Sequence, residues 1–156
     1  MSLIRFVTLT ADVMFVNGIA FLTTLSRKIR LTMVEHVPSR TAEQLSSSLT
    51  KIIQLYAKAG FTVRTTLMDM EFEKVAEKLN NIEVNTTAAR EHVDEIERQI
   101  RLIKERARAT IADMPFKYIP KQIVIHLIYF VALWLNAFPN KNGISEKYSP
   151  REIVTQ

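Results

Sequence analysis

The dipeptide Asn17-Gly18 stands between two runs in which apolar and polar residues alternate as they do in β-strands. Asparagine and glycine both tolerate positive φ angles, so this pair is typical of a two-residue hairpin turn. The flanking runs are Leu3–Val16 and Ile19–Leu25, and Leu31–His36 is a plausible third strand. The chain is therefore predicted to begin with a three-stranded antiparallel meander.

A helix and further strands are predicted after the meander. Thr41 is a suitable N-cap for a helix whose apolar stripe ends before Gly60. Phe61–Met68 then has the pattern of a strand, and a helix between two strands is typical of a crossover onto the same sheet. A short helix at Phe72–Leu79 and a short strand at Ile82–Val84 come next. These features predict one α/β domain in which parallel strands follow three antiparallel strands, with helices on the flanks.

A long amphipathic helix is predicted at Glu91–Arg108, where apolar residues recur at three- and four-residue steps. Glu97 falls beside this apolar stripe, whereas Glu95 falls on the opposite edge. Three cations share the sector of Glu97, namely Arg101, Lys104 and Arg108. Such a surface can hold a metal-binding carboxylate next to phosphate-binding bases. The alternative is a solvated helix face with i,i+4 ion pairs, and the helix by itself favours this alternative.

The C-terminal third is predicted to be helical with one interruption. The segment Asp113–Pro115 breaks the helical pattern because proline cannot continue it freely. Ile123–Phe138 is strongly apolar, but its 16 residues fall short of the roughly 20 that a membrane-spanning helix needs. We therefore expect a helix that packs on the domain, makes no membrane contact, and leaves one apolar face partly exposed for self-association. His126 and Trp134 are expected to be packing residues. Ser149, followed by proline, is expected to begin a last short helix.

Composition limits the possible partners and metal ligands. The 156 residues suffice for one domain with a hydrophobic core. A formal charge of +5 and a pI of about 9.6 favour a polyanionic partner. The chain has no cysteine, which excludes disulfides and cysteine-ligated zinc, and its three histidines lack ligand spacing. Carboxylates are therefore the candidate metal ligands.

Three acids stand where a carboxylate needs an explanation. Asp12 interrupts an apolar strand, where a carboxylate is costly unless it is paired or bound to metal. Asp69 stands at the C-terminal end of a strand, where α/β sheets bind their ligands. If these two strands are neighbours, the aspartates converge and Glu97 can lean over them. Three carboxylates suit Mg²⁺ or Mn²⁺, and two such ions can support phosphodiester chemistry.

Five segments follow one another in the order found in a known family. They are the acidic strand and hairpin Asp12–Arg27, LMDMEF at Leu67–Phe72, ERQIRLIKERAR at Glu97–Arg108, the helical stretch Met114–Pro139, and YSPREIV at Tyr148–Val154. Together they resemble the integrase catalytic core of copia-type retrotransposons, within the retroviral integrase superfamily. The resemblance runs from about Ala11 to the C-terminus.

The resemblance implies a ribonuclease H-like fold and a single integrase-type catalytic core over residues 1–156. This core is expected to be a fragment without the family's zinc-binding N-terminal module and C-terminal DNA-binding module. The implied activity is divalent-metal-dependent DNA strand transfer, the reaction of a polynucleotidyl transferase that integrates retrotransposon DNA. The implied partners are DNA and further copies of the chain. A nuclear or cytoplasmic location would follow only from that activity.

The resemblance also assigns roles to individual residues. The family's DDE triad, which is both catalytic and metal-binding, corresponds to Asp12, Asp69 and Glu97. Its cofactor would be Mg²⁺ or Mn²⁺. Arg101 and Lys104 match positions that contact DNA in the family, and Arg108 shares their helical sector.

Two alternatives remain beside the integrase reading. The first is a catalytically inactive, integrase-derived module that binds nucleic acid or oligomerises. It is favoured by Met70-Glu71, which replaces the Asn-Gly that usually follows the second acid. Retention of all three acids favours the enzyme. The second alternative is a ribonuclease H-type nuclease, which the Glu97–Arg108 motif and the YSPREIV tail disfavour.

Overall fold

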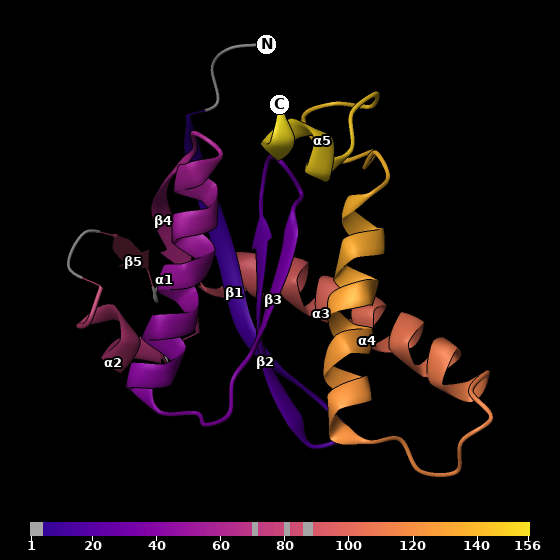
Figure 1. The fold of residues 1–156 in the computed structure, drawn as a ribbon. Helices are drawn as coiled ribbons and strands as arrows, with labels where there is room; N and C mark the ends of the chain where they lie inside the picture. The colour runs from indigo at the N-terminus through magenta and orange to yellow at the C-terminus, as the bar shows by residue number, and fades with distance from the viewer. Residues whose placement is uncertain (1–4, 70–71, 80–81, 86–88) are drawn as a thin grey trace.

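The computed structural model describes residues 5–69, 72–79, 82–85 and 89–156 (Figure 1). Its strands are β1 (Phe6–Val16), β2 (Ile19–Ser26), β3 (Thr32–His36), β4 (Thr62–Leu67) and β5 (Glu83–Asn85). Its helices are α1 (Ala42–Lys58), α2 (Glu73–Ala76), α3 (Ala89–Ala112), α4 (Lys121–Asn136) and α5 (Pro150–Thr155). The elements follow the predicted order.

The five strands form one mixed sheet in the order β3-β2-β1-β4-β5. β2 pairs antiparallel with both β1 and β3, whereas β4 pairs parallel with both β1 and β5. The hairpin turns through Asn17 and Gly18, whose φ angles of 49° and 74° lie in the left-handed region that this dipeptide favours. The predicted meander with parallel strands after it is therefore confirmed.

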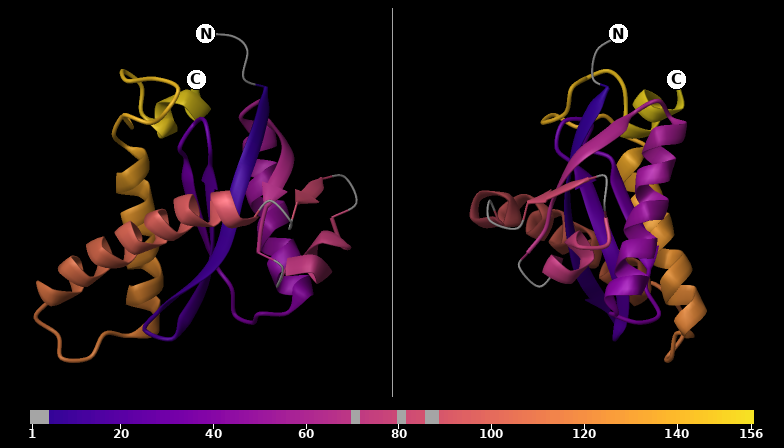
Figure 2. Two further views of the ribbon diagram at one scale, coloured as in Figure 1. Left: turned by 180° about the vertical axis from the view of Figure 1, so that it is seen from behind. Right: turned by 90° about the vertical axis from the view of Figure 1, so that its left-hand side faces the viewer.

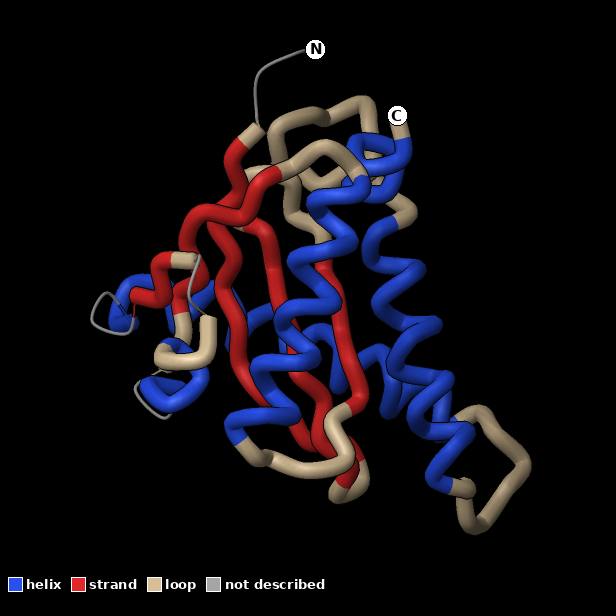
Figure 3. The backbone as a smooth tube through the Cα atoms, turned by 60° about the vertical axis from the view of Figure 1, so that its left-hand side comes forward, coloured by secondary structure: helices blue, strands red, loops and turns tan. Residues whose placement is uncertain are grey.

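Helices cover both faces of the sheet, so the central strand β1 is buried on both sides (Figure 3). Leu9 and Ala11 pack on one face together with residues of α1. Met14 packs on the other face, in the core that α3 and α4 complete. The alternation in the sequence predicts burial of the face that carries Leu9 and Ala11. It does not predict burial of the opposite face, because a strand covered on both sides does not need polar residues at every second position.

The helix α3 crosses the sheet over β1 and β2, while α4 lies along the edge strand β3 and packs against α3 (Figure 2). The apolar stripe predicted on the long helix is the buried side of α3, and its members are Ile96, Ile100, Ile103 and Ala107. They share a core with Phe21 of β2 and Ile128 of α4. The charged flanks of α3 therefore remain at the surface.

One buried amide connects α4 to the edge strand β3. The Oδ1 atom of Asn136 accepts a hydrogen bond from the N–H of Thr32 at 2.8 Å, and its Nδ2 atom donates to the Thr32 carbonyl at 2.6 Å. The outer backbone groups of an edge strand lack a neighbouring strand as a partner. The Asn136 side chain supplies that partner at the start of β3.

Only one side of α4 is covered, so the partial exposure predicted for this helix is confirmed. Val124 and Ile128 are buried, but Trp134 is 51% exposed and His126 is also exposed. His126 and Trp134, which were predicted to be packing residues, are therefore not buried in the core, because α4 lies at the edge of the sheet. No helix in the described part of the chain is both long and apolar enough to cross a membrane.

Candidate metal and nucleic-acid site

A hollow of about 370 Å³ opens between the second half of β1 and α3, and we call it the β1–α3 cleft. Four residues of β1 and five of α3 line it: Asp12, Val13, Met14, Phe15, Glu97, Ile100, Arg101, Lys104 and Arg108. Five of the six site residues predicted from the sequence therefore line this cleft. The sixth, Asp69, does not.

Asp12 lies in the middle strand of the sheet with its side chain half-buried. It stands two residues before Met14 and so points to the same face of β1, toward α3 and α4. Its Oδ1 atom accepts a hydrogen bond from the backbone N–H of Val13 at 2.7 Å. This bond restrains the orientation of the carboxylate in the cleft.

Asp69 follows β4, which is the parallel neighbour of β1. The last residue pair between the two strands is Thr10 with Leu67, so Asp12 and Asp69 each stand two residues beyond it. The two aspartates therefore stand level with each other, just beyond the end of the β1–β4 pairing. Asp69 is exposed, and the two residues that follow it lie outside the described part of the chain.

The described residues do not bring together three candidate metal ligands. Within those ranges, no three histidine, cysteine, aspartate or glutamate side chains come close enough together to hold a metal ion. Among the described residues, Asp12 and Glu97 are the carboxylates that line the cleft. Magnesium is commonly held by one or two carboxylates, with water and substrate phosphate oxygens at its remaining positions. Two carboxylates in one cleft are compatible with that mode of binding.

The phase of α3 separates two acids that are only two residues apart. Glu97 lines the cleft, whereas Glu95 lies on the opposite flank of the helix. The Oε2 atom of Glu95 is 3.4 Å from Arg27 Nε and 3.7 Å from Arg30 Nη1, which makes two ion pairs. Two residues correspond to about 200° of helix rotation, so the helical pattern could predict this division. It could not predict the two arginines, because they belong to the turn between β2 and β3.

The described residues that line the cleft carry more positive than negative charge. Arg101 and Arg108 are exposed, and Lys104 is half-buried. These three cations share the cleft with the carboxylates of Asp12 and Glu97. A surplus of basic side chains beside carboxylates attracts a phosphate backbone while it leaves ligands for a metal ion.

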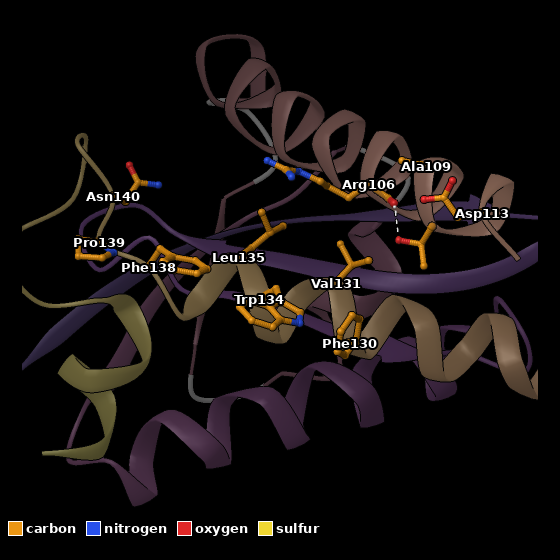
Figure 4. Close-up of a pocket in the computed structure, with 11 residues that line it drawn as sticks. Arg106, Ala109, Asp113, Phe130, Val131, Trp134, Leu135, Phe138, Pro139 and Asn140 are labelled. Carbon is orange, nitrogen blue, oxygen red and sulfur yellow. Dashed lines mark hydrogen bonds between the residues drawn. The ribbon is translucent and has the colours of Figure 1, made fainter.

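A second hollow, of about 630 Å³, lies between the C-terminal parts of α3 and α4 (Figure 4). We call it the α3–α4 groove. Three aromatic residues at four-residue steps form its aromatic row, namely Phe130, Trp134 and Phe138. The first two rings meet edge to face with centroids 6.0 Å apart, and the last two stack at 5.7 Å. Arg106 and Asp113 also line this groove.

The groove was not predicted from the sequence, although an apolar helix with a partly exposed face was. The nearly continuous apolar sequence of α4 indicates burial but does not show which side a partner element covers. The aromatic spacing at positions 130, 134 and 138 was the available signal, because residues four apart share one face of a helix.

Comparison with known proteins identifies the fold. No protein-family model matches the sequence, and no curated protein matches it. The structure is similar to the catalytic core domain of BIV integrase, with a TM-score of 0.64, 20% identity, and coverage of 95% of this chain and 93% of that chain. It is also similar to the HTLV-2 integrase catalytic core domain, solved in complex with magnesium in a trimeric form. There the TM-score is 0.67, the identity 16%, and the coverage 94% of each chain.

These similarities extend over nearly the whole of both chains. The mixed sheet and its flanking helices therefore have the ribonuclease H-like fold of retroviral integrase catalytic cores, as the sequence motifs implied.

Proposed function

We propose that this chain is an integrase-type catalytic core that transfers DNA strands with the help of a divalent metal ion, as copia-type retrotransposons do when they integrate. The observation that carries the proposal is the β1–α3 cleft, where Asp12 and Glu97 share one space with three cations. The fold shared with the BIV and HTLV-2 cores supports it. The motifs that resemble copia-type cores also support this proposal.

The two carboxylates of the cleft would hold the metal ion. Asp12 and Glu97 would each offer oxygen ligands, and Asp69 would add a third carboxylate from the adjacent strand end. Mg²⁺ prefers such oxygen ligands, and the HTLV-2 core is described in complex with magnesium. When bound, Mg²⁺ or Mn²⁺ would activate the attacking hydroxyl and stabilise the leaving oxygen. The Val13 N–H would keep the Asp12 carboxylate oriented for this role.

The cations of the cleft would bind the DNA backbone. Arg101, Lys104 and Arg108 all line the same space as the two carboxylates. Basic side chains on phosphates fix the position of a DNA strand without reading its sequence. They would thereby bring a phosphodiester bond next to the carboxylates.

A catalytically inactive module that self-associates is the second candidate function, and the aromatic row of α4 favours it. Phe130, Trp134 and Phe138 are each at least half exposed. Clustered apolar side chains at a surface mark sites of protein interaction. The HTLV-2 core is described as a trimeric form, and a homo-oligomer is compatible with both candidate functions.

A strand-transfer and disintegration assay on labelled donor DNA separates the two candidates, with Mg²⁺ and Mn²⁺ tested separately. We expect an active wild type. Glu97→Gln and Asp12→Asn should each lower the rate at least about a hundredfold, because metal ligation supplies several kcal/mol of transition-state stabilisation. Both variants should still bind DNA through the unchanged cations.

Glu105→Gln is the matched control, since it makes the same substitution at an exposed position of the same helix. It should retain the wild-type rate. A wild type that is inactive with both metals would make the self-associating module the better candidate. Full activity in Glu97→Gln would contradict the assigned role of this residue.

A further inference from the structure

Two side chains hold α3 from the flank opposite the cleft. The Oε2 atom of Glu95 lies 3.4 Å from Arg27 Nε and 3.7 Å from Arg30 Nη1. One turn later, Gln99 Nε2 donates a hydrogen bond to Thr32 Oγ1 at 2.8 Å. These contacts tie the first half of α3 to the β2–β3 turn and to the start of β3.

The turn that carries the two arginines is itself fixed. The N–H of Arg27 donates to the Thr8 carbonyl of β1 at 3.1 Å, and the Lys28 carbonyl accepts from the N–H of Ile144 at 3.1 Å. Arg30 has a φ angle of 63°, in the left-handed region that few residues other than glycine adopt. The turn is thus held by the sheet and by the loop between α4 and α5. Arg27 and Arg30 therefore have defined positions beside Glu95.

The apolar stripe of α3 does not by itself fix how far the helix is rolled about its axis. Hydrophobic contact is non-directional, whereas ion pairs and hydrogen bonds require defined distances between particular atoms. A side-chain tip about 6 Å from the axis moves by roughly 2 Å when a helix rolls by about 20°. A movement of this size would change the position of Glu97 relative to Asp12 in the cleft.

We propose, on the basis of the function proposed above, that Glu95 is a positioning residue for the cleft. Through Arg27 and Arg30 it sets the roll of α3, and it thereby holds Glu97 where this side chain can share a cation with Asp12. The Glu95 carboxylate lies on the far flank and takes no part in binding the cation. Its effect should therefore appear in metal affinity rather than in stability.

Manganese binding to the DNA-free protein, followed by the EPR signal of free Mn²⁺, tests this role. Glu95→Gln and Arg27→Gln should each weaken Mn²⁺ binding roughly three- to tenfold, at or below the low end of outer-shell effects on metal sites. The double variant should be no weaker than the weaker single variant, because both substitutions break the same pair. The thermal midpoint should hardly change, since partly exposed ion pairs contribute little to stability.

Glu105→Gln is again the matched control and should bind Mn²⁺ as the wild type does. Equal affinity in Glu95→Gln and Glu105→Gln would overturn the inference. It would also be overturned if the two single losses in Glu95→Gln and Arg27→Gln simply added in the double variant.

A distance measurement separates this inference from the proposed function. The chain has no cysteine, so spin labels can be attached at Glu105→Cys on α3 and Lys58→Cys on α1, both at exposed positions. Adding Glu95→Gln should shift or broaden the distance distribution measured by pulsed EPR. If the wild type binds no Mn²⁺, the proposed function fails and this measurement alone decides the role of Glu95. An unchanged distribution would overturn that role.

Discussion

The helices α3 and α4 pack against each other, yet they meet solvent in different ways. α3 buries a narrow apolar stripe completely, with Ile103 0% exposed, and presents charged side chains such as Arg101 on its outside. α4 is apolar on both sides, and Phe130 and Trp134 remain half exposed. The apolar content of a helix therefore does not predict what fraction of the helix surface the domain buries.

The difference also separates two kinds of partner. The outside of α3 combines cations with carboxylates in the β1–α3 cleft, which suits a polyanion and a metal ion. The outside of α4 carries the aromatic row, which suits a protein surface. The two helices should therefore respond differently to substitution, and the largest effect is expected on stability.

The attachment of α4 to the sheet should be the most sensitive point. Asn136→Ala leaves the buried N–H and carbonyl of Thr32 without their partner, so it should lower the free energy of unfolding by about 3 kcal/mol. Urea denaturation measures this change. Asn142→Ala, at an exposed loop position, is the control and should change stability little. Equal losses in the two variants would show that the amide does not attach α4.

The charged side of α3 should control DNA affinity. Lys104→Ala should weaken binding to all sequences and flatten the slope of log affinity against log salt by about one unit, because one phosphate contact is lost. Removing Arg101 and Arg108 as well should flatten it further. Arg106→Ala is the control, since Arg106 lines the α3–α4 groove instead of the cleft. An equal effect of Arg106→Ala would mean that DNA binding is not confined to the cleft.

The aromatic side of α4 should control self-association. Trp134→Lys should weaken it at least about tenfold, because large aromatic side chains contribute most to protein interfaces, while DNA binding should persist. Analytical ultracentrifugation measures the association. Tyr118→Lys is the control, because Tyr118 is 82% exposed but does not line the groove. A wild type that stays monomeric at high concentration would remove the proposed role of α4.

The smallest effect is expected at His36, where β3 approaches the beginning of α4. Burial, followed by the charge of Lys121, lowers the pKa of His36 below its ordinary value of 6.5. Between the lowered pKa and 6.5 the unfolded chain binds more protons, so the free energy of unfolding should fall as the pH decreases through that window. Denaturation at a series of pH values should show a shallow slope that His36→Gln flattens. A free energy that rises on acidification in this window would contradict the sign.

Much of the fold could be predicted because it depends on residues that are close in the chain. The Asn17-Gly18 turn follows from two residues with favourable φ angles. The start of α5 follows from Ser149, whose side chain accepts from the Glu152 N–H while the Glu152 carboxylate accepts from the Ser149 N–H. In the site, the helical period alone places Glu97 with the cations of α3.

Contacts between distant segments could not be predicted in this way. No spacing in the sequence links Glu95 to Arg27, because their approach depends on how α3 crosses the sheet. The exposure of Trp134 depends on the position of α4 beside β3 rather than over the sheet. The relation of Asp69 to the cleft depends on the backbone after β4, where neither the strand nor the helix period applies. Side-chain direction is predictable only inside regular elements.

The hydrogen bonds between Asn136 and Thr32 join residues that are 104 positions apart in the chain. Closing so long a loop costs more conformational entropy than forming the β1–β2 hairpin, so α4 should dock late in folding. A contact that forms after the transition state has a φ-value near zero, and its loss speeds unfolding with little change in the folding rate. This one amide should therefore affect how long the folded domain lasts much more than how fast it forms.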